Sequence, residues 1–289
     1  YSEDFSDSSW TKSNATLTLT SNIAPNGTTN SVYNYVGSSS NLYTQTQASG
    51  VLYTISFYVK SNNQSKDNFI LRLGSSSMIS QVFTATSEWV RYSFTNTPSS
   101  SIFSISSGTA SEVDVLIWGA QLEVGSYPTS YIPNFGTALG VTRNQDIFTR
   151  DGIGSLINST EGVLFVEIAA LSNDLTFRLI SLSDGTNNNT LKLGYRSDTN
   201  AIYVEVRSSS AAQVFWVYTT TDITDFHKIA VKYKVNDFSL WVDGVNVLND
   251  TSGNTPIGLS KLSFDRGDGS TPFYGKVKQL QVYDTSLSD

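Results

Sequence analysis

The sequence contains no cysteine among its 289 residues. Disulfide bonds, thiolate metal sites and cysteine nucleophiles are therefore excluded. It contains a single histidine, His227. A catalytic triad needs a nucleophile positioned beside its base, which makes a hydrolytic triad a poor interpretation of this one residue. We interpret His227 as a structural side chain at the start of a strand.

Charged residues are scarce as well. They make up 15% of the chain, and the formal net charge is −7. Nucleic acids and anionic membranes bind clustered lysine and arginine, and no such run is present, so neither is expected as a partner. No apolar run is long enough to cross a bilayer, so membrane insertion is not expected. Serine, threonine and asparagine take the place of charged residues and give a polar surface that can hydrogen-bond neutral ligands such as sugars.

Helical periodicity is almost absent, and short segments of alternating apolar and polar residues recur instead. Clusters of Ser, Asn, Gly and Asp separate them at spacings typical of a sandwich. Strands without intervening helices favour antiparallel sheets packed face to face. The sequence therefore predicts an all-β protein with two antiparallel β-sandwich (jelly-roll) domains in tandem. The predicted strands are residues 15–20, 52–60, 68–73, 89–94, 113–118, 163–169, 176–181, 190–195, 201–207, 214–219, 228–233, 238–242, 261–264 and 277–283.

The domain boundary is expected just after a proline-containing segment. Two of the six prolines lie in residues 127–136, and proline is disfavoured inside central strands. We predict a first domain over residues 1–135, a linker and the first strand of the next domain over 136–160, and a second domain over 161–289. The abrupt start at Tyr1 leads us to expect a piece of a longer protein.

Two acidic residues on one predicted strand, Glu112 and Asp114, resemble the start of the paired-carboxylate strand of retaining glucanases. That chemistry needs an acid and a nucleophile on one face, with carboxyl groups about 5 Å apart. The second glutamate would fall at Ile117, or at Leu116 without a bulge, and neither is acidic. We therefore expect no catalytic residue and no hydrolase activity.

Acidic, asparagine-rich loops are better candidates for a ligand site. One contains Asp184, Asn187 and Asn188, and another contains Asp265 and Asp268. Calcium prefers clustered oxygen ligands on irregular loops, and the same groups suit sugar hydroxyls. Asp-Gly and Asn-rich sequences are also ordinary turn sequences, so both interpretations stay open. No cofactor is required, and calcium is the ion that these aspartates would bind.

Four aromatic residues near the N-terminus lie in polar surroundings: Trp10, Tyr33, Tyr35 and Tyr43. Exposed aromatic rings stack against the C–H faces of sugars. These residues are therefore candidates for glycan binding. The alternative, that they cap the first sandwich, is equally compatible with the sequence.

The second half of the chain resembles the laminin-G and concanavalin-like (pentraxin-type) jelly roll. DFHKIAVKYKVNDFSLWVDGVNV is similar to the family's histidine, alternating strand and tight Asp-Gly hairpin, and FYGKVKQLQVYDTSLSD is similar to its final strand. The resemblance implies a structural histidine, in agreement with our interpretation of His227. Independently of it, Asp243-Gly244 between two alternating strands predicts a type I′ hairpin turn.

The first half resembles a jelly roll of the carbohydrate-binding-module type, through YSEDFSDSSWTKSN, YTISFYVK and GAQLEVGSYPTSYIPNFGTALGVTR. The last string is similar to the domain seam of bacteriophage tail-fibre or head-fibre adhesins, and of some bacterial surface proteins. In related modules a calcium ion joins an N-terminal glutamate to an aspartate near the last strand. Glu3 matches the glutamate, but Gly119 and Ala120 stand where the aspartate is expected.

The resemblance implies a non-enzymatic structural or adhesin protein of a phage virion, located at the virion surface or otherwise extracellular. Its expected partners are host-surface carbohydrate, bound through sandwich loops, and other virion proteins. A homo-oligomer is expected, with a trimer as the favoured form. Two alternatives stay open: a purely structural decoration or spacer module of a virion, and an ancillary carbohydrate-binding fragment of a secreted polysaccharide-degrading enzyme.

Overall fold

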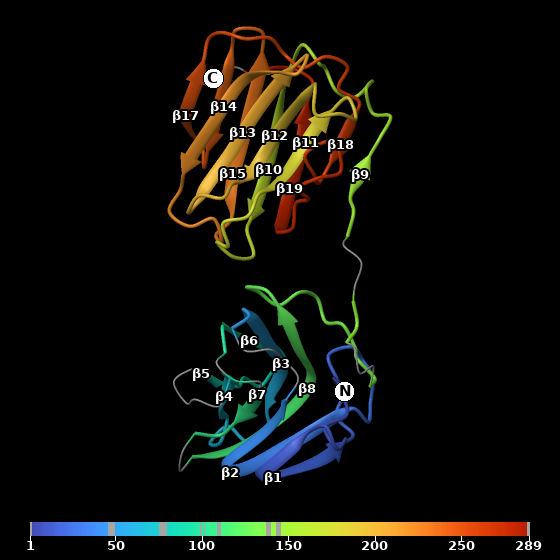
Figure 1. The fold of residues 1–289 in the computed structure, drawn as a ribbon, viewed down its shortest axis with the longest axis vertical. Helices are drawn as coiled ribbons and strands as arrows, with labels where there is room; N and C mark the ends of the chain where they lie inside the picture. Colours follow the sequence, from blue (N-terminus) through green and yellow to red (C-terminus); the bar gives the residue numbers. More distant parts are fainter. Residues whose placement is uncertain are drawn as a thin grey trace. The chain divides into compact units, whose positions relative to one another are not determined.

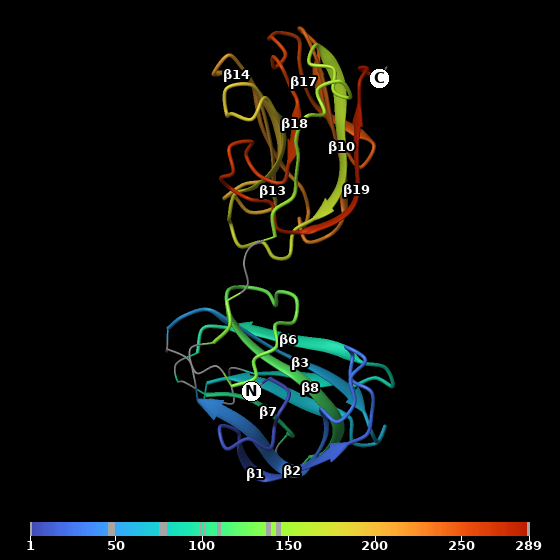
Figure 2. The ribbon, with the colours of Figure 1, turned by 90° about the vertical axis from the view of Figure 1, so that its right-hand side faces the viewer.

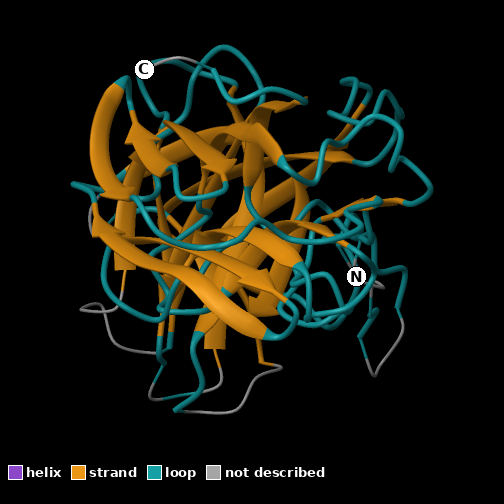
Figure 3. Cartoon of the chain, turned by 90° about the horizontal axis from the view of Figure 1, so that it is seen from above, coloured by secondary structure: helices purple, strands orange, loops and turns teal. Residues whose placement is uncertain are grey.

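The computed structural model describes residues 2–45, 50–74, 80–98, 100, 102–108, 111–136, 140–142 and 146–287. The chain divides into two compact units, Tyr1–Asn144 and Gln145–Asp289. Throughout the described residues the regular elements are β-strands (Figure 3). We find no helix among them that is long and apolar enough to cross a membrane. The predicted all-β class of antiparallel sheets is confirmed.

The first unit is one antiparallel sheet that bends over on itself (Figure 1). Its strands are β1 (Thr11–Thr20), β2 (Val32–Gln45), β3 (Tyr53–Ser61), β4 (Asn68–Leu73), β5 (Ser80–Thr84), β6 (Val90–Asn96), β7 (Ile102–Ser106) and β8 (Glu112–Val124). They pair in the order β5-β4-β7-β2-β8-β3-β6, and β1 pairs with β2. The first half of β2 pairs with β8 and the second half with β7. The bend lies between these halves, where Ser39 has a positive φ of 47°.

The bend brings two layers of this sheet together around an aromatic core. β4 packs against β3 and β6, although it is hydrogen-bonded to neither. The rings of Phe69 on β4 and Tyr92 on β6 meet edge to face, 5.0 Å apart. Phe5, Trp10 and Phe57 are buried beside them. Because each buried aromatic removes about 150–250 Å² from water, this cluster supplies much of the apolar burial that stabilises the unit.

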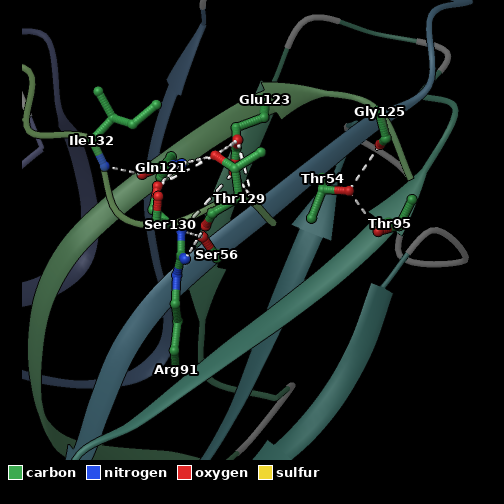
Figure 4. A network of polar contacts seen from close by, with 10 residues as sticks. All are labelled: Thr54, Ser56, Arg91, Thr95, Gln121, Glu123, Gly125, Thr129, Ser130 and Ile132. Atoms are coloured by element: carbon green, nitrogen blue, oxygen red, sulfur yellow. Dashed lines mark hydrogen bonds and ion pairs between the residues drawn. The ribbon is translucent and has the colours of Figure 1, made fainter. Parts of the chain in front are cut away.

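Polar contacts fix the proline-containing segment after β8 to the first unit (Figure 4). Glu123 accepts hydrogen bonds from the N–H of Thr129, at 3.0 Å, and from its hydroxyl. Gln121 Oε1 accepts a hydrogen bond of 2.8 Å from the N–H of Ile132, and Arg91 donates to the carbonyl of Thr129. The segment after β8 is not part of a sheet, so its backbone groups take their hydrogen-bond partners from these side chains instead.

The second unit is a sandwich of two separate sheets (Figure 2). One sheet has five strands in the order β17-β16-β15-β10-β19, and the other has six in the order β14-β13-β12-β11-β18-β9. The strands are β9 (Thr149–Arg150), β10 (Glu161–Ala169), β11 (Arg178–Ser183), β12 (Thr190–Tyr195), β13 (Ala201–Ser208), β14 (Ala211–Thr219), β15 (His227–Lys234), β16 (Phe238–Val242), β17 (Val245–Asp250), β18 (Lys261–Ser263) and β19 (Lys276–Tyr283).

Part of the predicted linker belongs to this second unit. Residues 137–139 and 143–145 of the linker lie outside the described residues. Further along, Thr149 and Arg150 form β9, which pairs with β18. Ile157 is buried in the core of the second unit, and Ile153 packs against that core.

His227 connects the start of β15 to the turn between β16 and β17. That turn, Asp243-Gly244, has φ values of 52° and 82°, as the predicted type I′ turn requires. His227 Nδ1 lies 2.7 Å from a carboxylate oxygen of Asp243, and Nε2 lies 2.9 Å from the carbonyl of Asp222. Both partners only accept, so both ring nitrogens act as donors. Burial disfavours the charged ring, but these hydrogen bonds outweigh it and raise the pKa of His227.

This raised pKa predicts a pH dependence of stability in the second unit. A group whose pKa is higher in the folded state stabilises that state fully below its unfolded pKa, here 6.5, and the stabilisation is lost as pH rises through the folded pKa. We therefore expect the free energy of unfolding to fall above pH 6.5, and an Asp243→Asn variant to lose most of that slope. Urea unfolding at several pH values measures it. An equal slope in the variant would contradict this assignment.

Candidate functional site

The outward side of the six-stranded sheet carries polar and charged side chains, and we call it the polar face. Leu191 and Leu193 of β12 and Val204 and Val206 of β13 belong to the core. Since side chains alternate along a strand, the residues between them point the other way. The polar face consists of Ser181, Ser183, Thr190, Lys192, Tyr203, Glu205, Arg207, Phe215 and Ser263.

An ion network lies at the centre of the polar face. Lys192 and Glu205 are cross-strand partners, and Lys192 Nζ lies 2.6 Å from one carboxylate oxygen of Glu205. Arg207 Nη1 lies 2.9 Å from the other oxygen. Burial alone would raise the pKa of Glu205, but hydrogen bonds from both cations outweigh it and lower that pKa. Two cations around one carboxylate leave the centre with excess positive charge and spare N–H donors.

Aromatic rings line the polar face beside this network. The ring of Tyr203 lies between those of Phe177 and Phe215, at centroid distances of 5.4 and 5.5 Å, with edge-to-face geometry on both sides. The Arg196 guanidinium lies 5.5 Å from the centroid of the Phe215 ring. Phe215 is 55% exposed. A large exposed aromatic side chain next to buried charge is a surface on which the C–H face of a sugar can stack.

The two loops selected from the sequence meet at one end of the polar face. A side chain at Gly267 would lie 3.0 Å from Cβ of Ser183 and 3.3 Å from the carbonyl of Thr186. Gly267 also has a φ of 102°, so glycine is required where the loops touch. Asn188 accepts a hydrogen bond of 2.9 Å from the hydroxyl of Ser210 in the β13–β14 turn. The structure thus brings into contact the two loops that carry five of the predicted residues: Asp184, Asn187, Asn188, Asp265 and Asp268.

Three buried polar atoms at this end have no hydrogen-bond partner among the described residues. They are Asn187 Oδ1, Thr190 Oγ1 and Arg207 Nε. Thr190 and Arg207 are cross-strand partners, and Asn187 lies in the loop that leads into β12. Leaving such groups unpaired costs about 1–3 kcal/mol each. Because each of these atoms has almost no accessible surface, a ligand hydroxyl contacts it only if the loop before β12 moves.

The predicted calcium ligands on these loops act as acceptors that close turns. Asp184 accepts from the N–H and hydroxyl of Thr186. Asp265 accepts from Ser263 and from the N–H groups of the two following glycines. Asp268 accepts from Arg266 at 2.8 Å, so a cation already occupies its vicinity. In the part of the chain that the structure describes, no group of three or more acidic or histidine side chains is placed to share a metal ion.

We therefore expect calcium to leave the stability of the second unit unchanged. A bound ion at a hundred times its Kd would add about 2.7 kcal/mol, which raises the melting temperature of a domain of this size by several degrees. Scanning calorimetry with millimolar calcium, and then with a chelator, should show a difference below about 1 °C. A reproducible rise in calcium that Asp265→Asn removes would overturn this expectation.

The four aromatic candidates lie elsewhere, in the first unit. Burial contradicts the surface role predicted for Trp10 and Tyr35, whereas Tyr33 lines a cavity with Glu3 and Asp4. Trp10 and Tyr35 belong to the core, with exposed fractions of 5% and 0%, and Tyr33 is 7% exposed. Tyr43 is half-buried on β2. The polar neighbours in the sequence misled the prediction because the second layer of the sandwich covers these rings, through contacts such as Trp10 with Phe103 at 5.6 Å.

Glu3 lines a cavity of about 420 Å³ in the first unit, together with Asp4, Asn30 and Asn134. Its carboxylate accepts a hydrogen bond of 2.9 Å from the hydroxyl of Tyr131. The ring of Tyr131 lies 3.1 Å from where a side chain at Gly119 would start. The Tyr131 ring thus lies between Glu3 and Gly119, one of the two positions at which the sequence resemblance led us to expect an aspartate.

Glu112 and Asp114 lie at the start of β8, separated by the buried side chain of Val113. Lys66 forms a 2.7 Å ion pair with Glu112. Asp114 accepts a hydrogen bond of 2.8 Å from the side chain of Asn62. Each carboxylate thus has its own partner, and Leu116 and Ile117 stand where a second glutamate would follow in a glucanase strand. The remaining acid of β8, Glu123, lies at the other end of the strand and accepts hydrogen bonds from Thr129.

No protein-family model matches the chain, and the comparison with curated proteins found no match. Among solved structures, Ruminococcus gnavus IT-sialidase CBM40 bound to alpha2,6 sialyllactose is 15% identical, with a TM-score of 0.40 over 49% of this chain and 94% of that one. Caenorhabditis elegans galectin LEC-6 is 14% identical, with a TM-score of 0.33 over 50% and 93%. Leech intramolecular trans-sialidase is 16% identical, with a TM-score of 0.39 over 47% of this chain and only 23% of the enzyme. Similarity at this level assigns neither a family nor a function.

Proposed function

We propose that this chain is a non-enzymatic glycan-binding protein, and that the polar face with its two loops is its binding surface. The observation that carries the proposal is the exposed ring of Phe215 beside the charged centre formed by Lys192, Glu205 and Arg207. Hydroxyls of a sugar both donate and accept, while its C–H faces are apolar. Such a ligand is complementary to both parts of this surface.

The finer proposal is an adhesin of a bacteriophage virion that binds host-surface glycans. Its support is the resemblance of residues 119–143 to the seam of phage fibre proteins, together with a surface of low charge. Each glycan contact exchanges hydrogen bonds with water for others, so we expect a monovalent Kd on the order of 1 mM. An oligomer, with a trimer as the favoured form, would add avidity of about 10²-fold or more.

The test is binding of the chain, tetramerised on streptavidin, to an array of bacterial surface polysaccharides. We expect retention on a subset of glycans, weakened by Asn187→Ala, and no retention of the monomer at the same concentration. If the tetramer binds no glycan but labels assembled virions, the chain is a structural virion module and the glycan proposal is wrong. Binding to storage or plant-wall polysaccharides alone would favour the ancillary fragment of a secreted enzyme.

We also expect no turnover of any glycan that binds. Leu116 and Ile117 stand where the next acid of a glucanase strand would follow Glu112 and Asp114, and both members of the pair are engaged, by Lys66 and Asn62. Release of reducing ends after prolonged incubation should match a buffer blank. Turnover that disappears in a Glu112→Gln, Asp114→Asn variant would refute the non-enzymatic assignment.

A further inference from the structure

The outward side of the five-stranded sheet in the second unit holds a cavity of about 400 Å³. Its position follows from the alternation of side chains. Leu164 and Val166 of β10, and Ile229 and Val231 of β15, belong to the core, so the residues between them face outward. The cavity is lined by Phe165, Lys228, Ala230, Lys232 and Trp241, with Leu287 from the C-terminal segment.

A small residue among large ones creates this cavity. Ala230 is the cross-strand partner of Trp241 on β16 and of Phe165 on β10. Lys228 and Lys232 lie two residues before and after Ala230 on the same strand, and therefore on the same face. Ala230 thus forms a floor with an aromatic ring on either side and a lysine at either end.

The charge of this cavity is unusual for the chain. Two lysines line it although the protein has a net charge of −7. Lys232 has an 8% exposed side chain, and its ammonium is held 3.0 Å from the carboxylate of Asp237. Lys228 is exposed at the other end. Burial of an apolar ligand ring between Trp241 and Phe165 would bring an anionic substituent next to Lys228, in surroundings where a charge-assisted hydrogen bond is strong.

The neighbouring strands carry amides level with the two aromatic rings. Asn246 of β17 is the cross-strand partner of Trp241, and Gln281 of β19 is the partner of Phe165. Amide groups both donate and accept hydrogen bonds, so they suit ring hydroxyls. Asn246 already exchanges hydrogen bonds with Asn249. Gln281 accepts one from Tyr283. A ligand hydroxyl would therefore meet a remaining N–H of each amide.

We propose that this cavity is a second binding site, separate from the polar face, and that its ligand is a sugar acid. The ring of the sugar stacks between Trp241 and Phe165 over Ala230, and its carboxylate pairs with Lys228. The hydroxyls face the amides of the flanking strands. The site does not depend on the glycan binding proposed for the polar face, because the two surfaces lie on opposite sheets of the unit.

The experiment titrates the full ¹⁵N-labelled chain with D-glucuronate and, separately, with D-glucose, following the indole N–H of Trp241. We expect a saturable shift with glucuronate and at least about tenfold weaker binding of glucose, because the neutral sugar lacks the charged contact. Ala230→Leu fills the floor without changing charge and should abolish the shift. Lys228→Met should weaken glucuronate about fivefold or more and leave glucose unaffected.

Phe215→Ala is the matched control, since it alters only the polar face. The Trp241 response to glucuronate should be unchanged in this variant, even if glycan binding at the polar face is lost or never existed. The proposal is overturned by the absence of a saturable Trp241 shift up to about 100 mM glucuronate, by an equal response to glucose, or by an unchanged response in Ala230→Leu.

Discussion

Replacing Glu205 by alanine should lower the free energy of unfolding of the second unit by about 3–5 kcal/mol. Glu205 accepts hydrogen bonds from Lys192 at 2.6 Å and from Arg207 at 2.9 Å. Lys192 is 1% exposed, so it cannot turn to water when its partner is removed. An uncompensated buried ammonium is among the most destabilising results of a single substitution. Hydrogen exchange of the β12 and β13 amides measures the effect in this unit alone.

The matched control replaces both members of the pair, as Lys192→Met with Glu205→Leu. Removing a buried ion pair as a whole is often neutral or stabilising, so this variant should recover most of the stability lost in Glu205→Ala. This double variant should fold but should not bind glycan, because the charged centre of the polar face is gone. A loss below about 1 kcal/mol in Glu205→Ala would mean that the pair is solvated and that Lys192 is not confined as described.

Phe215→Ala should weaken glycan binding at the polar face about tenfold or more, with little change in folding. Aromatic residues at the centre of a binding surface commonly contribute more than about 1–2 kcal/mol to affinity, and about 1.4 kcal/mol is a factor of ten. Phe215 is already 55% exposed, so its truncation removes little apolar burial. The measurement is glycan titration by calorimetry, together with urea unfolding.

Phe135→Ala provides the control for this prediction. Phe135 is 72% exposed and lies in the first unit, so its truncation removes a comparable ring from another surface. Affinity in this variant should equal that of the wild type. Equal losses in both variants would show that the binding surface is not confined to the polar face.

The alternation of the sequence located most strands because local pattern determines them. Residues 190–195 and 201–207 were predicted, and β12 and β13 are Thr190–Tyr195 and Ala201–Ser208. β2, the central strand of the first unit, was missed together with β5 and β7. Its middle reads GSSSN, which is typical of a loop, and it is a strand because it pairs with β1, β7 and β8 at once. Such pairing is long-range and leaves no local pattern.

The candidate site was predictable in part. The two acidic loops were placed at strand ends from the sequence, and the structure has them there, but their contact at Gly267 depends on the order of strands in the sheet. The ion network at Lys192 and Glu205 was missed, although LKL and VEV place a charge in the middle of apolar strands. That signal indicates only that a charge faces outward. Which loops cover it, and which charge lies opposite, follows from strand register.

The central claim is that the polar face of the second unit binds glycans. The most direct measurement is an NMR titration of the ¹⁵N-labelled chain with a glycan that was retained on the array. The chemical shift of each assigned backbone amide is followed. We predict saturable shifts on β12, β13 and β14, in the Asp184 and Asp265 loops, and at Phe215, all lost in Lys192→Met with Glu205→Leu. Shifts confined to the first unit, or an unchanged pattern in that variant, would contradict the claim.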